Sequence, residues 1–317
     1  MADLSDAATV RGLRDDNAMI GREHWKIVQE QIGHDAVRLS ESAVGGIDCQ
    51  WVHNCKGEGE QGKQDTGDQA PVILYFFGGA FVVGSPEDDL AITAKLAHFT
   101  RLSVCVPRYR RAPENPYPRA IEDAAAVYRE LVGVQRRRVL LVGESAGGHL
   151  ALRLLLDVLG DRELAAPEAV ALLSPWADLS HSGDSHVVCQ NLDPTLSVEH
   201  FLHPATCAYM GVPADASGTE KAKSPDVSPL FADMPARFPP VIITTGTRDL
   251  LMSDSIRLAA KLREAAAASE EGREAVVDLR VTDGMWHVFE WFSKLPEAEQ
   301  SLRGIADFLL KHQAAVR

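Results

Sequence analysis

The sequence predicts an α/β fold with a mostly parallel sheet of about eight strands, helices on both faces and a helical cap. Three observations predict it. From residue 71 onward, short apolar runs alternate with helical patterns, as in parallel sheets that are covered on both faces. A strand, a tight G-E-S-A-G turn and a helix follow one another at 139–160. A long polar segment at 180–238 interrupts the alternation, and such long loops are usually functional lids or insertions.

The N-terminal part of the chain does not follow this alternation. Residues 1–33 are mostly polar with a helical pattern, which favours two short helices that lie on other elements. Residues 37–53 carry β-branched side chains on either side of Gly45 and Gly46, and this arrangement predicts a hairpin. We expect the hairpin to add antiparallel strands at one edge of the sheet. The polar, glycine-rich residues 56–70 predict a surface loop.

The alternating region predicts six short strands and five helices. Prolines at 86, 116 and 296 stand where helices are expected to begin, because proline fits the first helical turn. The predicted strands are 72–77, 102–106, 139–142, 169–173, 241–245 and 275–281. The predicted helices are 86–99, 116–132, 150–159, one from about residue 253, and one from residue 296.

The interrupting segment is rich in Asp, Ser, His and Pro, and it has helical character only around 198–210. We expect it to form a cap over the carboxyl edge of the sheet, together with the N-terminal helices. The predicted division is therefore cap helices at 1–40, core at 41–180, a cap insertion at 181–238 and the rest of the core at 239–317.

Composition and charge argue against several classes of function. The chain has 317 residues, a formal net charge of −13 and a pI near 5.3, whereas a nucleic-acid-binding protein needs a basic face. The same charge disfavours an anionic membrane surface. No stretch approaches the roughly 18 apolar residues of a membrane span. The basic cluster at 136–138 is interpreted as solvated charge near a helix end.

The cysteines and histidines do not predict a metal site. Five cysteines occur, an odd number, with no C-x-x-C pair, which predicts neither a disulfide framework nor a zinc knuckle. Reduced thiols and an N-terminus without an apolar stretch predict a cytoplasmic protein. The spacings of His181, His186, His200 and His203 in the cap loosely permit metal binding, but no cysteine or carboxylate completes the set, so no metal is expected.

Ser145 is the candidate nucleophile. It lies in the G-E-S-A-G turn between an apolar strand and a helix, which is the context of a nucleophile elbow. So tight a turn strains the backbone of the serine and requires neighbours that nearly lack side chains, here Gly143, Gly147 and Gly148. The alternative is a glycine-rich turn with a solvated serine, which the flanking strand and helix disfavour.

A nucleophilic serine needs a general base and a carboxylate that orients the base. Asp249 and His287 each follow a predicted strand, so both stand at the carboxyl edge of the sheet and in the chain order Ser, Asp, His. Asp254 and Asp283 compete for the role of the acid. Helix capping explains Asp254, and Asp283 shares a loop with the histidine, where facing the imidazole is harder.

Other side chains near this edge have different expected roles. His149, one turn into the helix behind the serine, is interpreted as a packed or hydrogen-bonded residue rather than the base. The oxyanion needs backbone N–H donors, and the predicted donors are Gly78, Gly79 and Ala146. A plain Gly-Gly turn at 78–79 is the alternative. We expect Phe77, Ala80, Phe81, Glu144 and Trp286 to line the substrate pocket.

From residue 71 to the C-terminus, the chain resembles the hormone-sensitive-lipase-like family of α/β-hydrolase esterases. The motifs are YRRAPENPYPRAIEDA at 109–124, GESAGG at 143–148, SPWADLS at 174–180, TGTRDLLMSD at 245–254 and GMWHVF at 284–289. The resemblance implies the α/β-hydrolase fold with a cap, and hydrolysis of short- to medium-chain carboxylic esters without a cofactor. It implies Ser145, Asp249 and His287 as the catalytic triad. It also implies that a homodimer is common, and the strand at 275–281 could pair across a two-fold axis.

One motif departs from the family pattern, which usually reads H-G-G-G where this chain has F-G-G-A at 77–80. The histidine normally helps to hold the loop, and Ala80 narrows the space beside it, so we expect a changed acyl site. Residues 82–97 resemble bacterial members that open lactones or cleave acetyl esters, so a lactonase or an amide-cleaving enzyme is an alternative. Another is a small-molecule receptor, like the plant gibberellin receptors, which have lost the histidine that is present here as His287.

Overall fold

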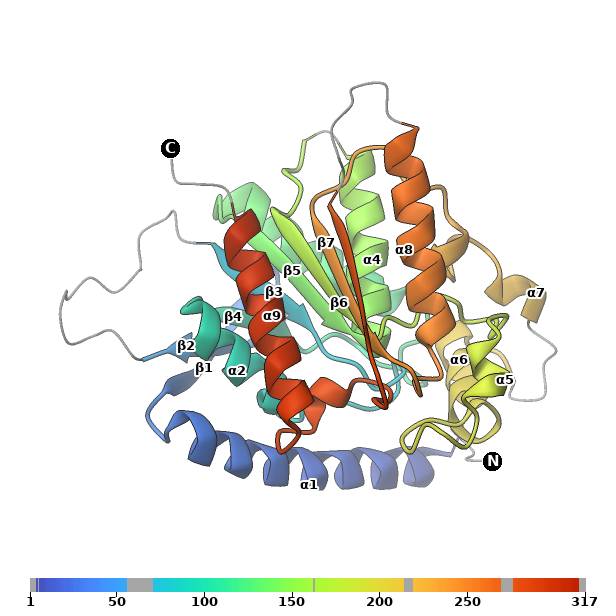
Figure 1. The fold of residues 1–317 in the computed structure, drawn as a ribbon, viewed down its shortest axis with the longest axis horizontal. Helices are drawn as coiled ribbons and strands as arrows, with labels where there is room; N and C mark the ends of the chain where they lie inside the picture. The colour runs from blue at the N-terminus through green and yellow to red at the C-terminus, as the bar shows by residue number, and fades with distance from the viewer. Residues whose placement is uncertain are drawn as a thin grey trace.

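A computed structural model describes residues 4, 6–55, 71–161, 163–213, 219–268 and 276–313. Within them the strands form one eight-stranded sheet, ordered β1-β2-β4-β3-β5-β6-β7-β8 (Figure 1). The strands from β4 to β8 in this order are parallel, and β2 is antiparallel to both of its neighbours. The strands are β1 (Val37–Val44), β2 (Ile47–Asn54), β3 (Val72–Phe76), β4 (Val104–Pro107), β5 (Val139–Glu144), β6 (Ala169–Leu173), β7 (Val241–Gly246) and β8 (Val277–Thr282).

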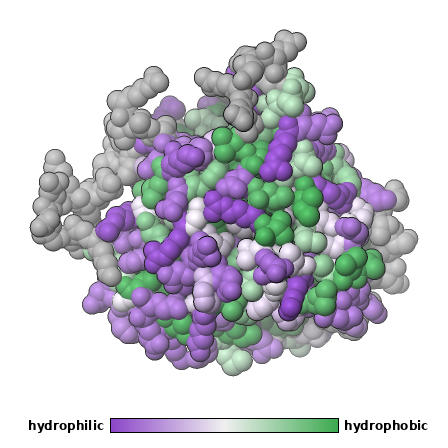
Figure 2. Space-filling model, in the orientation of Figure 1, coloured by the Kyte–Doolittle hydropathy of each residue, from purple (hydrophilic) through white to green (hydrophobic). Residues whose placement is uncertain are grey.

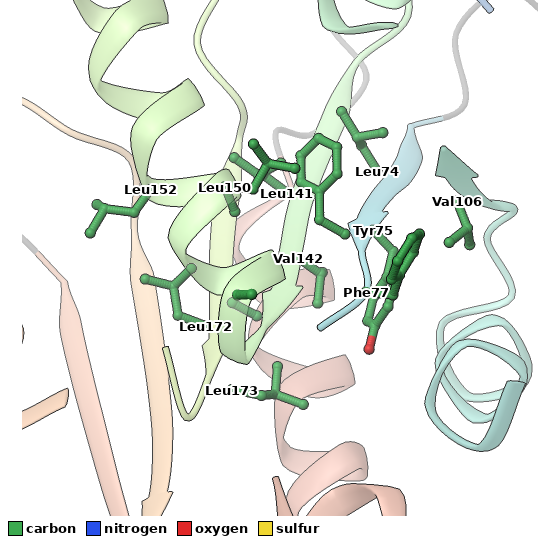
Figure 3. Close-up of a cluster of buried hydrophobic side chains, with 14 of the residues drawn as sticks. Leu74, Tyr75, Phe77, Val106, Leu141, Val142, Leu150, Leu152, Leu172 and Leu173 are labelled. Carbon is green, nitrogen blue, oxygen red and sulfur yellow. The ribbon is translucent and has the colours of Figure 1, made fainter. Parts of the chain in front are cut away.

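The central strands are buried on both faces. Every residue of β3, β5, β6 and β7 is buried, which explains why their sequences are continuous apolar runs rather than alternating patterns. Side chains from these strands and from α4 interlock in the core (Figure 3). By contrast, β8 is only partly buried, because it lies at the edge of the sheet.

Helices cover both faces of the sheet. On one face α2 and α9 pack against each other, and α3, α4 and α8 cover the other face (Figure 1). The helices are α1 (Ala7–Ile32), α2 (Leu90–Thr100), α3 (Arg119–Tyr128), α4 (Ser145–Gly160), α5 (Ser185–Val188), α6 (His203–Met210), α7 (Thr219–Ala222), α8 (Met252–Ala267) and α9 (Pro296–His312). None in the described part of the chain is long and apolar enough to cross a bilayer.

The N-terminal segment forms one long helix, so the prediction of two short helices is wrong. Asp6 caps α1 by accepting a hydrogen bond from the Thr9 N–H at 2.8 Å, and the helix then continues to Ile32. No proline interrupts it, and an interior glycine costs only about 1 kcal/mol. The helix lies along the bottom of the molecule in Figure 1.

Arg14 anchors α1 to the core. Its guanidinium donates to the carbonyl oxygens of Val82 at 2.9 Å and Ala112 at 3.0 Å, and it pairs with the Glu114 carboxylate at 2.8 Å. Further along the helix, Asn17 donates to Asp88 at 2.8 Å. These contacts hold the polar helix against the segments that follow β3 and β4.

The remaining elements confirm most of the predicted order and correct some bounds. The hairpin, the central strands, the helical stretch near 198–210 and the helix start at Pro296 are confirmed. The helix predicted from residue 86 begins only at Leu90, because 86–89 form a turn, and α3 ends in a π-helical segment, Arg129–Val134. The elbow helix begins at Ser145 itself and not at residue 150. The predicted loop at 56–70 lies outside the described residues.

Candidate active site

Ser145 stands at the junction of β5 and α4 with strained backbone angles. Its φ is +52°, in the left-handed region that residues other than glycine seldom adopt. The turn is closed by two glycines: a Cβ at Gly147 would collide with the backbone of Phe76, and one at Gly143 would collide with Gly147. The side chain of Ser145 is therefore presented at the edge of the sheet, as the predicted elbow requires.

The three predicted triad residues come together there. The Ser145 Oγ lies 2.9 Å from Nε2 of His287, and Nδ1 of His287 lies 3.1 Å from Oδ1 of Asp249. Asp249 follows β7 and His287 follows β8, so neighbouring strands deliver the acid and the base to one edge. Asp249 is fully buried, and His287 is 7% exposed.

Hydrogen bonds and charge shift the pKa values of Asp249 and His287. The carboxylate of Asp249 accepts from Thr245 Oγ1 at 2.7 Å and from the Leu251 N–H at 2.8 Å. Burial would raise the pKa of Asp249, but the charge of His287 and hydrogen bonds from His287, Ser174 and the Leu251 N–H hold it below its usual value. Burial would likewise lower the pKa of His287, but the Asp249 carboxylate raises it above its usual value. The pair is thus built to stabilise an imidazolium.

The competing residues lie elsewhere. Asp283 is exposed and accepts from Thr247 Oγ1 at 3.2 Å. Asp254 is buried in the first turn of α8, but its carboxylate accepts from the Asp178 N–H at 2.8 Å and does not cap its own helix, so that interpretation is wrong. His149 is buried, with Nδ1 3.0 Å from the Trp176 carbonyl oxygen, which confirms the packed role.

The cap segment contributes one residue that the sequence did not single out. Asp193 accepts from the N–H groups of His287 at 3.3 Å and Leu250 at 3.1 Å, so it ties the segment at 181–238 to the loops after β7 and β8. No motif marks it among the other aspartates. The rings of His181 and His186 meet edge to face with centroids 5.2 Å apart, but among the described residues no three His, Cys, Asp or Glu side chains are placed to hold a metal ion.

The loop after β3 departs from the prediction at one position. The Gly78 N–H donates to a carboxylate oxygen of Glu144, so it is not available to a substrate, and its prediction as an oxyanion donor is wrong. The loop turns sharply after it, with positive φ at Gly79 (+95°) and Ala80 (+53°). Its far end is held because the Gly79 carbonyl oxygen accepts from the Val82 and Val83 N–H groups, each at 2.9 Å.

A cavity of about 450 Å³ opens beside Ser145. Residues from α1, the loop after β3, the cap and the segment after His287 line it, which joins parts of the chain far apart in sequence. The lining residues are Leu13, Asp16, Asn17, Ile20, Gly78, Gly79, Ala80, Val83, Gly84, Asp89, Glu144, Ser145, Thr195, Leu196, Phe201, Leu202, His287, Val288, Trp291 and Phe292.

Of the five predicted pocket residues, Ala80 and Glu144 line this cavity and three aromatic residues do not. Phe77 stacks on Tyr109 with ring centroids 4.2 Å apart, and Phe81 stacks on Tyr209 at 4.1 Å. Trp286 packs edge-on against Phe292. Their side chains are held by other aromatic rings, and Trp291, which the sequence did not single out, faces the cavity.

Comparisons with known proteins agree with this architecture. The model of a family described as "alpha/beta hydrolase fold" matches residues 73–291. An esterase of Acinetobacter venetianus is 32% identical over 240 residues, which cover 75% of this chain and 74% of the relative. An acetyl-hydrolase of Streptomyces hygroscopicus is 30% identical over 269 residues, covering 84% and 80%.

Solved structures give the same result. The crystal structure of an esterase from the bacterial hormone-sensitive lipase family superposes with a TM-score of 0.75 at 28% identity, and it covers 94% of this chain and 97% of its own. The resemblance seen in the sequence motifs thus extends over the whole fold. The chain belongs to the alpha/beta hydrolase fold family, in the group of hormone-sensitive-lipase-like esterases.

Proposed function

We propose that the protein is a serine carboxylic ester hydrolase that cleaves short- to medium-chain esters. One observation carries the proposal: Ser145, His287 and Asp249 form a continuous hydrogen-bonded relay, and Ser145 and His287 face the cavity. The serine is the nucleophile, the histidine is the general base and the aspartate orients it. The chemistry needs no cofactor.

The reaction proceeds in two halves. His287 takes the proton of the Ser145 hydroxyl as Oγ attacks the ester carbonyl carbon, and the imidazolium then donates that proton to the departing alcohol. The acyl group stays on Ser145. A water molecule, deprotonated by His287, attacks the acyl carbon, and the proton returns to Ser145 as the carboxylic acid leaves.

Three backbone N–H groups are proposed to stabilise the oxyanion: those of Gly79, Ala80 and Ala146. Ala146 lies in the first turn of α4, where N–H groups have no partner within the helix. Gly79 and Ala80 replace the pair Gly78 and Gly79, because the Gly78 N–H is already bonded to Glu144. Each donor contributes about 3 kcal/mol to the transition state.

The proposed substrate is a small ester or lactone bound under a cap. The proposed cap consists of residues 1–40 and 181–238, which lie over the core at 41–180 and 239–317. Both parts supply apolar lining, such as Leu13 and Ile20 of α1 and Phe201 and Leu202 of the cap insertion. A cavity of about 450 Å³ suits a small ligand, and the relative from Streptomyces hygroscopicus is named for acetyl groups.

Two further proposals concern the setting of the protein. We place it in the reducing cytoplasm, since all five cysteines are thiols.

We also propose a homodimer that pairs the edge strands β8 across a two-fold axis. Val276 and Val281 are 38% and 41% exposed, and Figure 2 shows apolar surface in this region. A monomeric mass in light scattering would contradict the dimer.

The test of the function is covalent labelling followed by a substrate panel. A fluorophosphonate should attach once per chain, at Ser145, and mass spectrometry of the peptides should locate it there. The matched control is Ser255→Ala, which removes another buried hydroxyl and should label normally. p-Nitrophenyl esters, lactones and anilides then separate the esterase from the lactonase and the amide-cleaving enzyme. Tight ligand binding without labelling or turnover would favour the receptor instead.

The pH dependence should show an acid limb set by His287. The imidazole must be neutral to accept the serine proton, and its pKa is raised in the native site. As the pH is lowered, kcat/KM should therefore fall, and the midpoint of this fall should lie above about 6.5, the pKa of an ordinary histidine. The measurement is kcat/KM for p-nitrophenyl butyrate against pH. In Asp249→Asn the residual activity should show this acid limb at a lower pH, because the carboxylate that raises the pKa of His287 is gone. If the midpoint of the limb did not move, His287 would not be its source.

A further inference from the structure

Two buried carboxyl groups lie against the loop that follows β3. Asp89, at the start of α2, and Glu144, the last residue of β5, are each 6% exposed, and a hydrogen bond joins them. Both line the cavity that contains Ser145. Neither takes part in the proton transfers described above, and two carboxyl groups in contact within a protein interior need an explanation.

A chain of hydrogen bonds runs through the pair to the loop. Tyr75 of β3 donates its hydroxyl to Asp89 at 2.8 Å, Asp89 contacts Glu144, and Glu144 accepts from the Gly78 N–H. The fit is close, because a Cβ at Gly78 would collide with the Glu144 carboxylate. Since Glu144 directly precedes Ser145, these hydrogen bonds tie the loop after β3 to the nucleophile elbow.

Tyr109 is a second side-chain anchor of the loop, at the end of β3, while Arg14 and Arg111 bind the carbonyl oxygens of Val82 and Gly84 further along it. The Tyr109 hydroxyl donates to the Phe77 carbonyl oxygen at 2.7 Å, while its ring stacks on Phe77. The phenylalanine itself offers no hydrogen bond where the family pattern has a histidine. Glu144 is thus the group that determines where the segment from Gly78 to Ala80 lies relative to Ser145.

Contact between the two carboxyl groups requires a proton. The acidic groups that act on them include Tyr75, Asp88, Tyr109 and Glu290. The cationic Arg111 acts on Asp88 and Tyr109, and His287 lines the same cavity as the pair. Burial raises the pKa of Asp89 to about 7 and raises that of Glu144 well above its usual value. The pair therefore holds at least one proton at neutral pH, as two carboxylates this close cannot both ionise without strong repulsion.

We propose that Asp89 and Glu144 are positioning residues that share a proton, and that this shared proton holds the oxyanion loop in its catalytic position. The inference rests on the proposed ester hydrolysis. When the last proton leaves at alkaline pH, two adjacent carboxylates repel each other, Glu144 moves, and the Gly79 and Ala80 N–H groups lose their alignment with the oxyanion. Because the oxyanion forms only in the transition state, kcat falls and KM stays constant.

The test compares the pH profiles of the wild type, Glu144→Gln and Asp89→Asn. In the wild type, kcat should fall about tenfold for each unit by which the pH rises once the proton shared by Asp89 and Glu144 begins to leave. In Glu144→Gln the amide oxygen still accepts from Gly78 and the amide N–H donates to Asp89; in Asp89→Asn the amide donates to Glu144. Neither arrangement has a shared proton to lose, so both variants should hold their neutral kcat into the alkaline range.

A matched control and a disruptive variant complete the design. Asp254→Asn changes another buried carboxyl, one that accepts from the Asp178 N–H at 2.8 Å and does not line the cavity, and it should keep the alkaline limb. Glu144→Leu removes the acceptor of Gly78 and should lower kcat by about 10² to 10³-fold with little change in KM. Circular dichroism and thermal unfolding show whether it folds.

The outcomes are separable from those of the proposed function. An alkaline limb that persists in both amide variants, or a wild type without such a limb, overturns the shared proton. A folded Glu144→Leu variant with wild-type kcat overturns the positioning role. In each of these cases the fluorophosphonate would still label Ser145, and the enzyme would still cleave esters. If instead Ser145→Ala retained full turnover, the ester hydrolysis mechanism itself would be wrong.

Discussion

Ser145→Ala is expected to lower kcat for p-nitrophenyl butyrate by about 10⁶-fold, the loss seen when a catalytic serine is removed from a complete relay. The residue is the only part of the proposed mechanism that bonds covalently to the acyl group, so nothing else replaces it. The substitution leaves Gly143 and Gly147 unchanged, and these two glycines make the close contacts of the turn, so the fold should persist. Initial rates and a thermal melt measure the two effects.

The control for this change is Ser255→Ala. Ser255 is buried in α8 and makes only a long hydrogen bond, 3.4 Å, to the Leu251 carbonyl oxygen. It should keep wild-type kcat. Turnover by Ser145→Ala that matches the wild type would refute the assignment of the nucleophile, whereas loss of activity in both variants would point to damage of the fold rather than of the chemistry.

Asp249→Asn should lower kcat by about 10⁴-fold, the effect of this substitution in a serine triad. The amide keeps the shape of the carboxylate, its oxygen still accepts from Thr245 Oγ1, and its NH2 group takes the place of Oδ1, which faces His287. It cannot stabilise the imidazolium, however, and it favours the imidazole tautomer with its proton on the wrong nitrogen. KM should change little, because Asp249 does not line the cavity.

Asp283→Asn is the matched comparison for the acid. It stands four residues before His287, but it is exposed and bonds to Thr247. Its kcat should equal that of the wild type within about twofold, as for most surface substitutions. If instead Asp283→Asn were the damaging change and Asp249→Asn were mild, the acid would be misassigned.

The sequence predicted the parts of the fold that local pattern determines. Strands such as Ala169–Leu173 are apolar throughout because both faces are covered, and that pattern is visible without coordinates. The elbow and the loops after β7 and β8 are short and carry motifs, so Ser145, Asp249 and His287 could be named in order. Their convergence follows from the parallel sheet alone.

The features that escaped prediction depend on side-chain direction and long-range contact. Phe77 and Phe81 lie within two residues of the glycines predicted as oxyanion donors, yet each stacks on a tyrosine from another part of the chain. The bond from Gly78 to Glu144 joins the loop after β3 to the last residue of β5. Asp193 carries no motif, and its role exists only once the cap is folded. Such contacts leave no periodic signal in the sequence.

The position of α1 has a consequence for the order in which activity arises during synthesis. This helix is synthesised before the core, and it completes a cavity whose other wall includes Trp291, which is synthesised much later. Its anchor, Arg14, needs the loops at 82 and 112 to be in place. A nascent chain therefore cannot hydrolyse esters until His287 has emerged and α1 has docked, so segments far apart in the sequence must fold together before the enzyme becomes active.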